Sequence, residues 1–302
     1  MSLRVAAAPP LAVERQRVPR PVGLSGVRRV LRRHPRIAVG GSLVAVLVAA
    51  ALLAPVIAPY NPVEVDAARG LQPPSPAHWF GTDDLGRDVF SRVVWGSRIS
   101  LSVGVISVSL GLLAGVSLGL FAGYLGGVVD LLAMRAIDAL LAFPGLILAI
   151  SITAALGPQI QNAMIAIGIV AIPAYTRLTR GQVLSVRERE FITAARTIGA
   201  PARRIVLRHI LPNVTNPLVV QATLSTAFAV LAEAALSFLG LGAQPPAPSW
   251  GQDINYSRRY LANLMWWMSA GPGVAIFLAV FAFNFLGDAL RDALDPQLRR
   301  RG

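Results

Sequence analysis

The sequence predicts an all-α, polytopic membrane protein with six transmembrane helices. Of its 302 residues, 54% are hydrophobic and only 14% are charged, and the mean hydropathy is +0.59. Soluble domains carry about 25% charged residues, so most of this chain is expected to lie in a bilayer. Apolar runs of membrane-spanning length alternate with polar segments, and these polar segments differ in their arginine content.

Six apolar runs follow one another along the chain. They cover residues 37–58, 99–122, 128–154, 160–174, 217–241 and 270–287. The first is membrane-long, whereas the apolar region of a signal peptide is about 7–15 residues, so we predict an uncleaved span. The third run contains Asp130, Arg135, Asp138 and Pro144, and the fourth is short with Pro173 near its end.

The arginines predict the orientation, because cytoplasmic segments carry an excess of positive charge. Residues 1–36 hold nine arginines and one glutamate, and residues 175–217 hold eight arginines and two glutamates. The arginines of residues 59–98 are balanced by five acidic side chains. Both termini and the loop 175–217 are therefore predicted to be cytoplasmic.

This topology divides the chain into four parts. We predict a basic cytoplasmic tail over 1–36, a first span with an extracytoplasmic segment over 37–98, a five-helix core over 99–290, and a cytoplasmic tail over 291–302. The net charge of +13 follows from this topology, so no nucleic-acid partner is expected. The N-terminal tail is suited to contact with anionic membrane lipid.

The residue types that are missing limit the chemistry. The chain has no cysteine and no lysine. A P-loop needs a lysine to hold nucleotide phosphates, so no nucleotide-hydrolysing site is expected. His34, His78 and His209 lie in different regions, which disfavours a metal cluster. We therefore predict no catalytic, cofactor-binding or metal-binding residues.

The loop 175–217 predicts two short helices. Ser185 and Glu188 have the spacing of a capping box, and Gly199 followed by Pro201 is a stop signal, so the first helix is expected over 186–198. Its predicted apolar stripe consists of Phe191, Ala194, Ala195 and Ile198. A second helix is expected to start at Ala200 and Pro201 and to end at Pro212.

This loop resembles the cytoplasmic loop of permease subunits in binding-protein-dependent ABC importers. The family motif, Glu-Ala-Ala with a later Gly and Leu-Pro, corresponds here to Thr193, Ala194, Ala195, Gly199, Leu211 and Pro212, preceded by Glu190 and Phe191. The sequence departs from the motif at Thr193, which replaces the glutamate. The resemblance implies a coupling helix that docks into a groove of an ATPase subunit, with the small alanines allowing close approach. A bulky charged residue at Ala195 is then expected to uncouple ATP hydrolysis from transport.

Two other interpretations of the loop remain open. It can be a solvated amphipathic connection between two spans. Alternatively, two short helices with arginines on the second suit a DNA-binding helix-turn-helix, although the flanking apolar runs disfavour this.

The segment from Trp79 reads WFGTDDLGRDVFSRVVWGSRISL, and a later segment reads GLGAQPPAPSWG. Thr82 or Asp83 is predicted to cap a short helix, and the three aspartates Asp83, Asp84 and Asp88 are predicted to serve as caps and ion-pair partners. Together the two segments resemble the second permease of dipeptide, oligopeptide and nickel importers.

That resemblance implies a type I ABC importer permease fold in the bacterial cytoplasmic membrane. The implied partners are a second homologous permease, ATPase subunits that bind ATP and magnesium, and an extracytoplasmic substrate-binding protein. Dipeptides or oligopeptides are the implied cargo. Nickel or another small cargo, and an ion-coupled secondary transporter, are the alternatives.

Two further features stand out within the apolar runs. Gly111, Gly115, Gly119 and Gly123 recur at every fourth position, which forms a smooth face for helix packing. This face can pack inside the chain or line the contact with a partner subunit. Asp138 and Glu233 are ionisable at membrane depth, where such groups are costly. Either can line a substrate path, or be paired internally, for example with Arg135.

Overall fold

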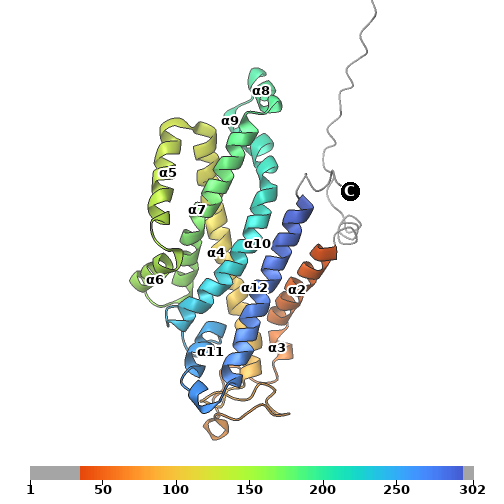
Figure 1. Ribbon diagram of the computed structural model, residues 1–302, viewed down its shortest axis with the longest axis vertical. Coiled ribbons are helices and arrows are strands. Elements are labelled where there is room, and N and C mark those ends of the chain that lie inside the picture. Colours follow the sequence, from red (N-terminus) through yellow and green to blue (C-terminus); the bar gives the residue numbers. More distant parts are fainter. Residues whose placement is uncertain (1–34, 295–302) are drawn as a thin grey trace, which may run out of the picture.

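The computed structural model describes residues 35–294, which form a bundle of long helices packed lengthwise (Figure 1). Five helices are long and apolar enough to cross a membrane. They are α2 (Pro35–Leu52), α4 (Val89–Leu125), α7 (Ile160–Arg187), α10 (Leu211–Phe238) and α12 (Trp267–Leu294). A sixth crossing is provided by the bent pair α5 (Gly127–Leu141) and α6 (Gly145–Leu156), if they are counted together. The predicted all-α membrane architecture is confirmed.

Short helical elements connect these spans. They are α3 (Ala54–Ile57), the 3-10 turns Ala67–Arg69 and Leu261–Asn263, α8 (Glu190–Thr197), α9 (Ala202–Arg204), the π-helical turn Ile205–Ile210 and α11 (Trp250–Ser257). In Figure 1, α8 and α11 lie near opposite ends of the molecule, which are called here the α8 end and the α11 end. The predicted tail 1–36 lies outside the described residues apart from its last two, as does the C-terminal tail beyond residue 294.

The third apolar run was predicted to form a single transmembrane helix, but in the structure it is divided into two helices. α5 and α6 meet at 88°. Pro144 stands at the start of α6 with an extended ψ of 128°. Proline has no backbone N–H to continue the α5 hydrogen-bond ladder, and its ring disfavours a helical conformation at Phe143. The chain therefore turns sharply there.

Two spans extend well beyond their predicted limits. α4 starts at Val89 because the Asp88 carboxylate caps it, accepting a hydrogen bond from the Ser91 N–H at 2.7 Å. The predicted cap at Thr82 or Asp83 was therefore wrong, whereas the predicted capping role of Asp88 is confirmed. α7 passes through Pro173 and ends only at Arg187. Ser185 lies inside this helix, so the predicted capping box does not form.

The glycine face of α4 packs against α7 of the same chain. A Cβ placed on Gly115 would lie 2.6 Å from Tyr175 Cβ and 2.7 Å from the Ile172 carbonyl oxygen. Gly111, Gly119 and Gly123 make similar approaches to α7, with the nearest atoms at 2.7, 2.6 and 2.8 Å. Small residues bring helix backbones together in lipid, and here they form a seam with α7 along α4 from Gly111 to Gly123.

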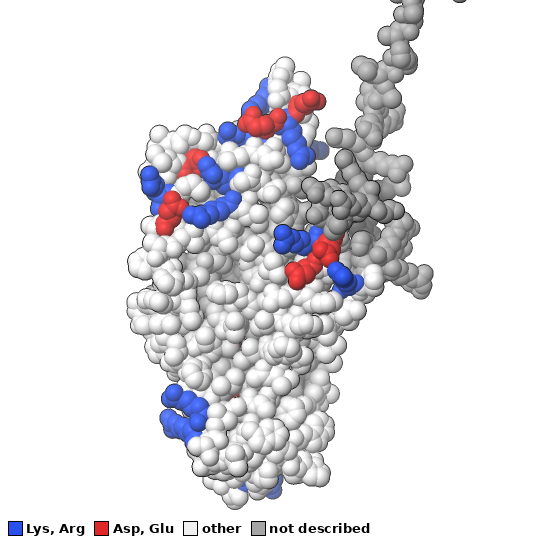
Figure 2. All heavy atoms as spheres, viewed as in Figure 1, with Lys and Arg blue, Asp and Glu red and all other residues white. Residues whose placement is uncertain are grey.

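The outer surface has the character expected for a bilayer. Figure 2 shows a wide uncharged belt across the visible face, with many of the charged side chains gathered toward the α8 end. α2 is only 11% buried over its apolar window and packs on α12 and α4. Large apolar side chains exposed on this belt include Val46, Leu113, Phe121 and Phe277. An exposed apolar belt is stable in lipid, where no water has to be excluded.

Replacing Gly115 with alanine is expected to destabilise the protein by about 3 kcal/mol, because the new methyl group overlaps α7 backbone and Cβ atoms. Thermal unfolding in detergent measures this change. Gly41→Ala is the matched control, since no atom lies within 4 Å of a Cβ at Gly41. Equal unfolding temperatures for the two variants would contradict the seam.

Candidate functional site

The segment between α7 and α10 forms a small helical unit at the α8 end. α8 stops where Gly199 adopts φ +76°, a conformation that favours glycine, and the Gly199 N–H donates to the Arg196 carbonyl at 2.9 Å. The predicted stop at Gly199 is therefore present. The helix itself runs over Glu190–Thr197, four residues shorter at its start than the predicted 186–198.

The second predicted helix is not a separate element. α9, the π-helical turn and α10 form one continuous helical stretch, Ala202–Phe238. Pro212 enters the first turn of α10 rather than ending a helix, because the π turn before it already changes the hydrogen-bond register. Since its second helix continues into a membrane-length span, this unit does not form the freestanding helix-turn-helix considered above.

One face of α8 is buried in the chain itself. Ile192 is fully buried and Ala195 is 8% exposed, and both belong to the cluster that contains Val183, Val186 and Ile205. The predicted stripe was therefore wrong in part. It included Ala195 correctly, but it left out Ile192.

The opposite face of α8 is open. Thr193, Ala194 and Gly199 are exposed, as is Glu190, and the Ile198 side chain is 83% exposed. Phe191 and Leu211 are half-buried and Pro212 is exposed. Of the two motif alanines, only Ala194 can contact another protein, because Ala195 already packs inward.

Two arginines, one at the end of α7 and one on α8, contact the end of α4. Arg187 Nη1 donates to the Gly123 carbonyl at 2.9 Å. The Arg196 guanidinium lies 5.9 Å from the centre of the Tyr124 ring, within the range of a cation–π contact. α8 is therefore linked to both helices of the glycine seam.

Asp138 and Glu233, the two predicted path residues, have very different surroundings. Asp138 forms an ion pair with Arg177 at 2.6 Å, and both side chains are about half exposed. Arg177, not the suggested Arg135, is thus its partner. Among residues 35–294, no group of three or more His, Cys, Asp or Glu side chains could hold a metal ion.

Glu233 is fully enclosed. Its carboxylate accepts hydrogen bonds from the hydroxyl groups of Ser100, Ser237 and Ser249 at 2.8, 2.7 and 2.9 Å. Three hydroxyl donors satisfy a carboxylate that would otherwise be very costly to bury. This contact joins α4, α10 and the start of α11, and it leaves Glu233 no exposed surface for a substrate.

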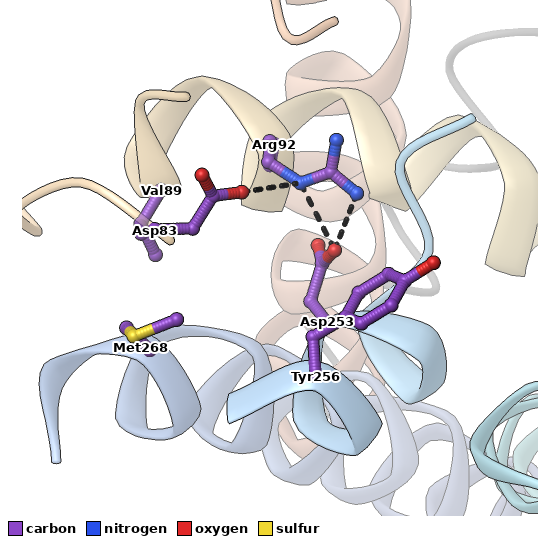
Figure 3. Close-up of a pocket in the computed structure, with 6 residues that line it drawn as sticks. All are labelled: Asp83, Val89, Arg92, Asp253, Tyr256 and Met268. Carbon is purple, nitrogen blue, oxygen red and sulfur yellow. Dashed lines mark hydrogen bonds and ion pairs between the residues drawn. The ribbon is translucent and has the colours of Figure 1, made fainter. Parts of the chain in front are cut away.

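The α11 end is held by a second buried polar cluster (Figure 3). Arg92 donates to Asp253 Oδ1 through Nε and Nη2, at 2.9 and 2.5 Å, and Asp83 Oδ2 lies 3.9 Å from Arg92 Nε. Asp83 also accepts from Arg87 Nε at 2.6 Å. Burial raises the pKa of Asp253, and the Arg92 guanidinium opposes that rise. The predicted role of Asp83 as an ion-pair partner agrees with this geometry.

The Asp88 cap belongs to the same end. Besides the Ser91 N–H, Asp88 accepts the Ser91 hydroxyl at 2.7 Å and contacts His78 Nδ1 at 2.9 Å. The segment 81–92, which carries part of the family resemblance, therefore serves mainly to fix the start of α4. Sequence analysis missed its partners, because Asp253 lies 161 residues from Arg92 along the chain.

Sequence analysis also missed a groove between α7 and α10. Two adjoining hollows of about 420 and 280 Å³ share Gln221 and Leu224 in their lining. Asn216 lines the first hollow and Ser225 the second. The available signal was the recurrence of Asn216, Gln221 and Ser225, which lie four to five positions apart, although α10 carries other polar residues as well.

Comparisons with known proteins identify the family. Residues 115–300 match the family described as binding-protein-dependent transport system inner membrane component. Residues 24–74 match the N-terminal TM domain of oligopeptide transport permease C. The chain belongs to this permease family.

Several curated relatives match this permease over most of its length. The dipeptide transport system permease protein DppC of Alkalihalophilus pseudofirmus is 47% identical, with 89% of this chain and 88% of the relative covered. The glutathione transport system permease protein GsiD of Pectobacterium atrosepticum is 45% identical, with 90% of each chain covered. The di/tripeptide transport system permease protein DppC of Pseudomonas aeruginosa is 46% identical, with coverage of 88% and 90%.

A solved structure supports the fold. A chain of the MetNI methionine ABC transporter, in an inward-facing conformation, matches with a TM-score of 0.51 and 21% identity. The match covers 66% of this chain and 95% of that chain. The permease therefore has the type I importer fold that the sequence predicted, and its family favours an ABC importer subunit over the ion-coupled secondary transporter.

Replacing Arg92 with methionine is expected to destabilise this permease by about 3–5 kcal/mol, because Asp253 would remain buried without its cation. Thermal unfolding in detergent at several pH values measures the loss. Since the pKa of Asp253 is already raised and would rise further, the loss should shrink as the pH falls through that pKa.

The double variant Arg92→Met with Asp253→Asn serves as the control. It removes both charges, so most of the stability should return and the pH dependence should disappear. A single variant as stable as the wild type would contradict this role for the ion pair.

Proposed function

We propose that this permease imports short peptides as one of two homologous membrane subunits of an ATP-driven importer. The relatives' names support the cargo, since transport of dipeptides, di/tripeptides or glutathione is printed for those at 45–47% identity. A second permease, cytoplasmic ATPase subunits with ATP and magnesium, and an extracytoplasmic binding protein complete the assembly. Nickel or another small cargo is the alternative.

The proposed location is the bacterial cytoplasmic membrane, with both termini and α8 on the cytoplasmic side. The arginine distribution supports this orientation, because the loop 175–217 and residues 1–36 are strongly basic. The number of helices agrees with this orientation. When α5 and α6 are counted as one bent span, the number of crossings is even, which places both termini on the same side of the membrane.

The exposed face of α8 supports its role as the coupling helix. Ala194 presents a small side chain that allows a partner backbone to approach closely. Beside it, the exposed Ile198 side chain offers an apolar contact at an otherwise charged end of the molecule. Thr193, in place of the family's glutamate, leaves this face without a carboxylate at that position. An apolar groove of an ATPase subunit is complementary to such a surface.

The buried face of α8 supports a way to transmit movement. Ile192 and Ala195 fix α8 to the cluster formed by α7 and the π-helical turn, and Arg187 and Arg196 link the unit to α4. A displacement of α8 by the ATPase would therefore move the whole α4–α7 seam. Such a movement can shift the equilibrium between outward and inward access.

Purification of the tagged protein in mild detergent tests the assembly. We expect a second permease and P-loop ATPases to be purified with it, and the complex to hydrolyse ATP. Uptake of a labelled dipeptide, with nickel as the competing cargo, tests the substrate in membrane vesicles supplied with the binding protein. A lone chain without ATPase activity in several detergents would contradict the proposal.

Ala194→Arg is expected to abolish ATPase docking and reduce uptake, because the large side chain blocks the close approach. Forcing a larger side chain into a packed contact costs about 1–3 kcal/mol, which weakens the binding of the ATPase subunit. Co-purification measures how much of the ATPase subunit stays bound, and transport into vesicles measures uptake. Ala195→Arg, suggested by the sequence, tests docking less well, since Ala195 is buried and the change would disturb the fold.

Ala202→Arg is the matched control, because Ala202 is an exposed alanine in the neighbouring α9. This variant should keep most of its bound ATPase subunit and most of its uptake activity. Equal losses in the two variants would show that added charge alone, rather than a contact at α8, explains the effect.

A further inference from the structure

The α7–α10 groove runs from the α8 end toward the apolar middle of the bundle. Its two hollows share Gln221 and Leu224, and its α7 wall continues from Ala174 to Leu178, one helical turn apart. From Asn216 to Phe228 the groove follows α10 for about 18 Å. Its hollows of about 420 and 280 Å³ are comparable with small-molecule sites, which are typically about 300–1,000 Å³.

The polar groups of the groove lie on one side of α10. Gln221 Nε2 donates to Ser225 Oγ at 3.2 Å, so both side chains face the same hollow. Asn216 lines the part nearer the α8 end, and Ser107 of α4 lines the part farther from it. A primary amide has two donors and two acceptor lone pairs, so this one bond leaves capacity for a ligand.

Large exposed side chains on α2 and α12 differ from the polar side chains of the groove. Val46 on α2 and Phe277 on α12 are 66% and 64% exposed and purely apolar, as lipid contact requires. A half-exposed glutamine and serine, Gln221 and Ser225, would each lose hydrogen bonds to water if they faced acyl chains. Water or a polar solute is therefore a better match for the groove than lipid.

The charge of the groove is also distinctive. Among the described residues that line its two hollows, only Arg291 is charged, and it lies at the mouth nearer the α8 end. Asp138 is paired with Arg177, and Glu233 is enclosed by three serines, so neither carboxylate belongs to this lining. Uncharged amides and hydroxyls can bind the amide groups of a peptide backbone without reading the charge of its side chains.

We propose that the α7–α10 groove, with Asn216, Gln221 and Ser225, is this subunit's wall of the translocation path and contacts the peptide backbone. The groove replaces Asp138 and Glu233 as the site of substrate contact. Peptide passage is then insensitive to side-chain charge within the membrane. The peptide part of this inference rests on the proposed function.

Single cysteines test the groove directly, because the wild-type chain has none. Asn216→Cys, Gln221→Cys and Ser225→Cys are made in the full importer complex in vesicles, with Val46→Cys and Phe277→Cys as controls of high exposure. A charged, water-soluble methanethiosulfonate reagent is applied during turnover. We expect the three groove cysteines to react, alanyl-alanine to slow that reaction, and the controls to stay unmodified.

Groove cysteines that react no faster than the controls would overturn the inference, as would reaction unaffected by alanyl-alanine in vesicles that import it. Uptake of alanyl-alanine by the wild-type complex tests the proposed function separately. A wild-type complex that imports no peptide overturns the proposed cargo and the peptide contact. Reagent access to the groove would then still distinguish a water-filled path from a lipid-facing surface.

A second measurement adds charge after folding, so a folding defect cannot explain it. The Gln221→Cys complex is modified with either a sulfonate-bearing or a trimethylammonium-bearing reagent. The sulfonate adduct should favour lysine-containing over glutamate-containing dipeptides by about tenfold, and the ammonium adduct the reverse, since opposite charges attract in a low-dielectric path. Adducts of opposite charge that change both uptake rates equally would overturn the contact at Gln221.

Discussion

The close approach of α4 and α7 is the constraint on which the rest of the structure depends. With glycines at every fourth position, the α4 backbone comes so near α7 that even one methyl group would overlap Tyr175 Cβ or the Ile172 carbonyl. In lipid, apolar surface gives little drive for helices to associate, so van der Waals packing of this kind becomes the main source of specificity. The seam sets the position of α7, and α7 forms one wall of the groove and leads into α8.

At the α11 end, buried polar contacts hold the helices together, as glycine packing does along the α4–α7 seam. Glu233 gathers three serine hydroxyls from α4, α10 and the start of α11, and Arg92 holds Asp253 of α11 to α4. Trp250 adds a hydrogen bond from Nε1 to the Val93 carbonyl at 2.8 Å. Buried polar groups of this kind tolerate few alternative arrangements, because each unpaired member is costly. They hold α11 in one position against the bundle.

The α8 end combines a fixed inner face with an open outer face. Ile192 and Ala195 hold α8 to the bundle, while Ala194 and Ile198 remain exposed. A partner that moves the outer face must therefore move the inner one, and with it α7 and α4. The groove lies along α7 and α10, so the same movement would change its shape. The α8 helix and the groove are thus linked by packed helices rather than by a flexible loop.

The sequence by itself determined the membrane class, the existence and order of the spans, the family motif and the stop at Gly199, because hydropathy, charge asymmetry and glycine depend on local sequence. Only the tertiary structure decided which face of α8 is buried, where α4 and α7 end, and which groups surround Asp138 and Glu233. Arg177 lies 39 residues from Asp138, and Ser100 lies 133 residues from Glu233. Partners so distant in the chain meet only through helix packing, and that packing leaves no local pattern around the carboxylates.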